Sequence, residues 1–199
     1  MKSNRDDGCR ITDAGFISGG LVIDNVTGPY FDDIDENNGV FSADSRRTAY
    51  VAKINGKYRA VIDGVPGPRF DTVLIATLMF SPDSRHVAYM STQGGRAVWV
   101  VDGQVDAFHG ELVQSLVFGP NGHRAYVSRR DDKSVLIVDD HVEMAYQNII
   151  DLVFSPDGLK LAYSATTDNT SIAVMNGQPG PCYLTTGSFA FSPNSRRFS

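Results

Sequence analysis

The sequence predicts an all-β fold built from one short unit that repeats along the chain. The unit centres on a Phe-Ser-Pro-Asp motif, whose phenylalanine recurs at steps of 39, 38, 36 and 37 residues. A period of this size is typical of repeat proteins, in which each unit buries its apolar face against its neighbours. The five phenylalanines are Phe41, Phe80, Phe118, Phe154 and Phe191.

Each unit contains two strands joined by a tight connection. In the second copy an apolar run ends at Phe80, a polar stretch follows at residues 81–86, and a second β-rich run leads to Tyr89. Pro82 lacks an amide hydrogen for a sheet ladder and fixes φ at a value that suits a turn. We therefore expect a β-hairpin with a connection of five to six residues.

An acidic or amide side chain follows the proline, or its equivalent, in every copy. Such a side chain accepts hydrogen bonds from nearby backbone amides and so stabilises the turn. Because it recurs in all copies, a single catalytic role is disfavoured and we interpret it as structural. The residues are Asp44, Asp83, Asn121, Asp157 and Asn194.

The motif at residues 154–158, followed by Ala162 and Tyr163, resembles the WD40-like (PD40) repeats of TolB-type β-propellers. The second half of the unit agrees, since Val-Ile-Asp-Gly at 61–64 precedes Gly-Pro-Arg-Phe-Asp at 67–71. The resemblance covers roughly residues 19–199. It implies a propeller of four-stranded antiparallel blades, with the run before each motif phenylalanine as the first strand and, in the second copy, a fourth strand near Phe108. The repeated tyrosines are then packing residues between blades.

The phase of the repeat predicts how the blades close. We expect residues 1–18 to be a flexible tail and residues 19–199 to be the propeller, which opens at Gly20 with the third strand of a blade and continues to a fourth near Tyr30. The repeats lie near 41–79, 80–117, 118–153 and 154–190, with a split blade made of 191–199 and 19–40. Pairing of the N- and C-terminal half-blades would close a ring of five blades. The alternative is a fragment of a six- to eight-bladed propeller, and an unclosed ring could form oligomers.

The composition restricts the partners. The 199 residues are 42% hydrophobic and carry a net charge of −5, which is typical of a soluble protein and disfavours nucleic acid as a partner. No apolar run approaches the length of a membrane span, so we expect no membrane insertion. The N-terminus lacks the apolar core of a signal peptide, which indicates the cytoplasm if Met1 is the native start, whereas the family resemblance implies the periplasm. Cys9 and Cys182 form no C-x-x-C pair and indicate no zinc site.

No pattern in the sequence predicts a catalytic, metal or cofactor site. The run Asp33-Ile34-Asp35-Glu36 resembles a calcium loop only loosely, because the glycine that such a loop needs is missing at Asn38. Counted from the motif phenylalanines, His86 and His123 differ by one position, so a histidine metal cluster is not expected. We expect no enzyme and no cofactor. If the chain is a glycosidase, acids at unmatched repeat positions are the ones to test, such as Glu111 and Glu143.

We expect a non-catalytic propeller scaffold that binds another protein or a ligand. The loops between the second and third strands differ in charge and length while the frame repeats, and such loops are where repeat scaffolds place recognition. The candidate partner-binding residues are Lys57, Arg96, Arg129, Arg130, Asp131 and Asp132. The alternatives are the propeller domain of a hydrolase, either a prolyl-oligopeptidase-type gating domain or a five-bladed glycosidase, and a lectin-like carbohydrate-binding ring.

Overall fold

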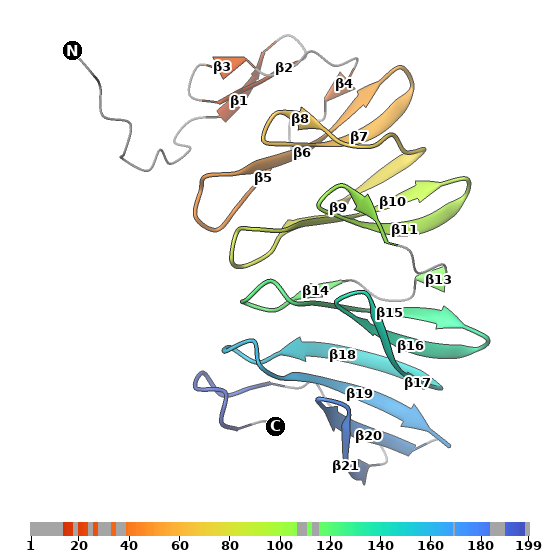
Figure 1. Cartoon of the computed structure of the whole chain (residues 1–199). Helices are drawn as coiled ribbons and strands as arrows, with labels where there is room; N and C mark the ends of the chain where they lie inside the picture. The colour runs from red at the N-terminus through yellow and green to blue at the C-terminus, as the bar shows by residue number, and fades with distance from the viewer. Residues whose placement is uncertain are drawn as a thin grey trace. The chain divides into compact units, whose positions relative to one another are not determined.

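The computed structural model describes residues 14–17, 20–23, 26–27, 33–34, 39–106, 111–112, 116–168, 170–183 and 190–197. All regular structure in these residues is β-strand (Figure 1). Among the same residues, no helix is long and apolar enough to cross a membrane. The chain divides into two compact units, one made of residues 1–80 and 84–105 and the other of residues 81–83 and 106–199.

The predicted all-β propeller fold is confirmed, because the strands form four successive blades with four antiparallel strand positions each. Every blade is a meander whose four strand positions pair in chain order, and in two blades the first position is split into two short strands that both pair with the second. The connection between the first two strands has six residues in the first, second and fourth blades. It has five residues in the third blade, and both lengths are those that the motif predicts.

The first unit holds two blades. The first blade comprises β4 (Asp33–Ile34), β5 (Val40–Phe41), β6 (Thr48–Ile54), β7 (Lys57–Ile62) and β8 (Val65–Pro66). The second comprises β9 (Thr72–Phe80), β10 (Val87–Gln93), β11 (Arg96–Val101) and β12 (Gln104–Val105). A shared apolar core lies between them, where the buried Tyr89 ring packs edge-on against Phe70 with centroids 6.2 Å apart.

The second unit repeats this plan. Its first blade comprises β13 (Glu111–Leu112), β14 (Val117–Phe118), β15 (Arg124–Arg130), β16 (Lys133–Val138) and β17 (His141–Tyr146). Its second comprises β18 (Asn148–Phe154), β19 (Leu161–Thr167), β20 (Thr170–Met175) and β21 (Gln178–Tyr183). Tyr163 is buried in the core between them, edge-on to Tyr146. The four repeated tyrosines are therefore packing residues, at most 1% exposed: Tyr50, Tyr89, Tyr126 and Tyr163.

The strands before the first blade form a three-stranded sheet in the order β1 (Ala14–Ile17), β2 (Gly20–Ile23) and β3 (Val26–Thr27). The end of the expected tail therefore pairs with the strand that opens the predicted propeller. The expected partner strand around Tyr30, the outer strand near Phe108 and residues 1–13 lie outside the described residues.

The expectation that the loops between second and third strands differ in length is wrong. Ile54 pairs with Lys57, Gln93 with Arg96, and Arg130 with Lys133, so each of these hairpins has a two-residue turn. Both turn residues have positive φ, for example 51° at Asn55 and 73° at Gly56. This is the turn whose twist matches that of the flanking strands, which is why the length does not vary. The loops differ only in side chains.

Candidate functional site

The Ser-Pro-Asp connection is a closed hydrogen-bond network. Asp44 Oδ1 accepts hydrogen bonds from Ser42 Oγ at 2.6 Å and from the Arg46 amide at 3.1 Å. Ser42 Oγ in turn accepts one from the Arg47 amide at 2.9 Å. These bonds hold the pKa of the Asp44 carboxyl below its ordinary value, with the Ser42 hydroxyl as the largest cause. The same geometry recurs around Asp157, and with an uncharged amide at Asn194.

A second network joins two places in each blade. A residue in the hairpin after the third strand caps the start of the second strand. Oδ1 of the residue at this hairpin accepts the amide of the first residue of the second strand, at 2.9–3.0 Å in all four blades. The four residues are Asp63, Asp102, Asp139 and Asn176. Where the residue is aspartate, its other oxygen pairs with the side chain immediately before the strand.

The histidines take part in this second network, which corrects the expectation that they lie at different phases. His86 Nδ1 lies 2.7 Å from Asp102, and His123 Nδ1 lies 2.6 Å from Asp139. The two occupy equivalent positions because the connection of the third blade is one residue shorter. Among the described residues, no group of three or more His, Cys, Asp and Glu side chains could hold a metal ion.

Neighbouring blades of one unit are joined through the same turns. In the first unit the Asp44 amide donates to Ser84 Oγ at 3.1 Å, and the Arg47 guanidinium donates to the Arg85 carbonyl. In the second unit the Asp157 amide donates to Ser195 Oγ at 3.0 Å. The sequence analysis did not predict these contacts between blades. The serine at the end of the turn recurs at Ser84 and Ser195, and this recurrence could have indicated them.

Gly158 replaces that serine in the fourth blade for a steric reason. Its φ is +71°, and a Cβ atom there would lie 2.6 Å from the Asn121 side chain. Asn121 Nδ2 instead donates to the Gly158 carbonyl at 3.3 Å. The joint between these two blades is thus made by the asparagine of one turn and the glycine of the next.

The candidate partner-binding residues all lie at hairpins. Lys57 pairs with Asp71 at 2.6 Å, and the same carboxylate accepts the Gly94 amide, so this lysine already has an ion-pair partner. Arg96 and Arg129 are exposed. The three other residues, Arg130, Asp131 and Asp132, are exposed at the β15–β16 hairpin, where the Arg130 and Asp131 charges lie 3.9 Å apart.

Of the two acids considered for catalysis, Glu111 lies in the short strand β13 and Glu143 in β17. Glu143 is exposed at the edge of a cavity of about 220 Å³, beside the buried Tyr163. It is the single carboxylate among the described residues that line this cavity.

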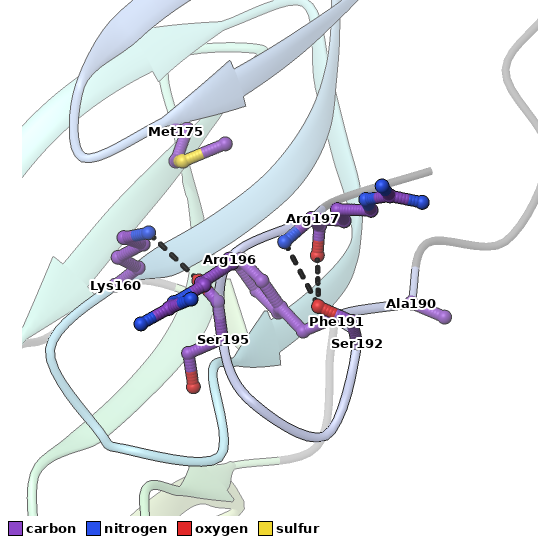
Figure 2. Close-up of a pocket in the computed structure, with 8 residues that line it drawn as sticks. All are labelled: Lys160, Met175, Ala190, Phe191, Ser192, Ser195, Arg196 and Arg197. Atoms are coloured by element: carbon purple, nitrogen blue, oxygen red, sulfur yellow. Dashed lines mark hydrogen bonds between the residues drawn. The ribbon is translucent and has the colours of Figure 1, made fainter.

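A larger cavity, of about 750 Å³, lies beside the last Ser-Pro-Asn turn (Figure 2). Lys160, Arg196 and Arg197 supply its charged lining, and Met175, Ala190 and Phe191 its apolar lining. The remaining lining residues are Ser192 and Ser195, and the Lys160 ammonium donates to the Ser195 carbonyl at 2.8 Å. Sequence reasoning did not identify this cavity.

No family model and no curated protein matches the chain. Among solved structures, a eukaryotic initiation factor is similar with a TM-score of 0.51 and 15% identity, over 90% of this chain and 54% of that one. TolB from Acinetobacter baumannii has a TM-score of 0.41 and 16% identity, over 83% of this chain and 49% of that one. A candidate 6-phosphogluconolactonase from Bacteroides uniformis has a TM-score of 0.40 and 16% identity, over 89% and 64%. The chain spans about half the length of the first two, and similarity at this identity concerns the fold alone.

Proposed function

We propose that this protein is a non-catalytic, TolB-like propeller scaffold that binds another protein through the charged hairpin between β15 and β16. One observation carries the proposal. The turn residues Asp131 and Asp132 have φ values of 49° and 60°, whereas Gly56 and Gly95 take the second turn position in the first two blades. Left-handed backbone costs aspartate more than glycine, and backbone strain is typical of sites where the side chains have a function.

The charges at this hairpin are available to a partner. Arg130 and Asp131 are 70% and 94% exposed, and an ion pair in such a place contributes at most about 1 kcal/mol. By contrast, Asp44 accepts hydrogen bonds within its own turn, and Asp63 and its equivalents accept the first amide of a second strand. Exposed charges of both signs on a fixed hairpin favour a partner with a complementary charge pattern.

The glycosidase alternative requires two carboxylates that face one bond of the substrate. Glu143 lines its cavity without a second acid among the described residues there. This arrangement favours the scaffold over the hydrolase.

The test is quantitative affinity capture from the source organism with the wild-type chain and with the Arg129→Gln/Arg130→Gln variant. Arg69→Gln is the control for the loss of an exposed arginine, because Arg69 is exposed on a different segment. We expect a specific protein that the wild type and the control retain and the hairpin variant loses, and direct binding of that purified protein should show the same order. Equal retention by all three chains would contradict the proposal. Specific binding to a glycan array in place of a protein would favour the lectin alternative.

A further inference from the structure

One blade lacks a carboxylate that the other three have. The side chain immediately before the second strand pairs with an aspartate in each of the first three blades. Arg47 pairs with Asp63 at 2.9 Å, and the corresponding distances for His86 and His123 are 2.7 and 2.6 Å. In the fourth blade Lys160 holds this position, and Asn176 stands where the other blades have the aspartate.

The asparagine keeps the hydrogen bond to the strand amide but lacks the negative charge of the aspartate. Its Oδ1 accepts the Leu161 amide at 2.9 Å, as Asp63 Oδ1 accepts the Thr48 amide at 3.0 Å. An amide nitrogen replaces the second carboxylate oxygen and cannot neutralise an ammonium group. The Lys160 ammonium donates to the Ser195 carbonyl instead.

A second carboxylate is replaced in the turn that borders the same cavity. Asn194 Oδ1 accepts bonds from Ser192 Oγ at 2.8 Å and from the Arg196 amide at 3.2 Å, so the turn closes as it does around Asp44. The amide carries no charge. The next carboxylate along this network is Asp157, which accepts bonds from Ser155 Oγ and the Leu159 amide of its own turn.

The two replacements leave basic side chains and no carboxylate in the described lining of the 750 Å³ cavity. Its described lining includes Lys160, Arg196 and Arg197 and no carboxylate. Figure 2 shows the ends of Lys160 and Arg196 on the same side of the turn, with Arg197 pointing the other way. Guanidinium and ammonium groups form charge-assisted hydrogen bonds with carboxylates.

We propose that this cavity binds an acidic peptide segment, with Lys160 and Arg196 contacting its carboxylates. The volume lies in the range of ligand pockets and exceeds what a single small anion requires. Met175 and Phe191 add apolar surface for the aliphatic parts of such a peptide. The site is distinct from the β15–β16 hairpin of the proposed function and does not depend on it.

The test is fluorescence anisotropy of a labelled hexaglutamate peptide with the full chain at low ionic strength. We expect saturable binding that weakens as salt is added, and no binding of hexaglutamine. The decisive variant is Asn176→Asp, which restores the carboxylate that three blades already accommodate and keeps the cap on the Leu161 amide. We expect it to weaken hexaglutamate binding by about tenfold, equivalent to roughly 1.4 kcal/mol.

Three further chains complete the design. Lys160→Gln/Arg196→Gln should lose binding, whereas Arg69→Gln, with an equal change of charge per residue elsewhere, should keep it. The hairpin variant Arg129→Gln/Arg130→Gln should also keep it, which separates failure of this site from failure of the proposed function. Thermal melting confirms that each variant is folded. Unchanged binding by folded Asn176→Asp, or equal binding of hexaglutamine, would overturn the proposal.

Discussion

Asp83 represents the turn aspartates, each of which accepts hydrogen bonds within its own connection. The Ser81 hydroxyl donates to the Asp83 carboxylate. Asp83→Ala should lower the free energy of unfolding by about 1 kcal/mol, because a side-chain hydrogen bond of a turn is lost. Denaturant unfolding measures the change, and Asp83→Asn is the control that should stay near wild type, since Asn194 makes the same bond in another copy. Unchanged stability of Asp83→Ala would contradict a structural role.

The buried tyrosines predict how stability depends on alkaline pH. Burial raises the pKa of Tyr50 and of Tyr89 from 10.0 to about 12. A raised pKa in the folded state means that stability is complete below pH 10 and declines as the pH rises from 10 towards 12. Tyr89→Phe keeps the ring and removes the ionising group, so its unfolding midpoint on an alkaline titration should shift to higher pH. Tyr58→Phe, at a half-buried ring, is the control, and an equal shift in both variants would contradict the assignment.

Between elements, the turns of adjacent blades fit one another in pairs. The Gly158 position faces the Asn121 side chain so closely that a Cβ atom would lie 2.6 Å from it. Gly158→Ala should therefore destabilise the protein by about 1–3 kcal/mol, through overpacking and a φ that alanine disfavours. In the Asn121→Ala background the steric part disappears, so the cost of Gly158→Ala should be smaller. A double-mutant cycle of denaturant unfolding tests this coupling, and strictly additive costs would show that the two residues do not restrict each other.

At the scale of the whole molecule, the phase of the repeat still predicts closure between residues 19–40 and 191–199. Deleting residues 1–32 removes β1, β2 and β3. If the ring closes through this region, the deletion should lower the melting temperature and cause self-association, because an open strand edge pairs with other chains. Melting and size-exclusion chromatography of both chains provide the measurement. A monomeric deletion variant that melts like the full chain would falsify closure and favour an open array with local interfaces.

We also expect no hydrolase activity from the whole chain. Asp44 accepts a backbone hydrogen bond in its own turn, and Asp63, Asp102 and Asp139 accept the first amide of a second strand. Glu143 lines its cavity without a second described acid. A screen with peptide, ester and glycoside reporters tests this expectation. Turnover that vanishes on substitution of one non-repeating residue, such as Glu143→Gln, would assign an enzyme instead.

The sequence by itself determined the all-β class, the four complete blades and the position of each Phe-Ser-Pro-Asp connection. These features are local, because the patterns that specify them act within about ten residues. The patterns are the proline geometry, an aspartate two residues beyond a serine, and an apolar run that alternates. The periodicity of the tyrosines likewise indicated buried packing positions.

Only the tertiary structure decided which residues join neighbouring blades and where basic side chains line a cavity without a carboxylate. Ser84 meets the Asp44 amide across 40 residues, and His86 meets Asp102 across 16. Counting from Phe118 misplaced His123, because one connection is a residue shorter while the sheet register is kept. The importance of Asn176 depends on Lys160 and Arg196, which line the cavity from separate segments. Such contacts depend on how distant segments pack, which local patterns do not encode.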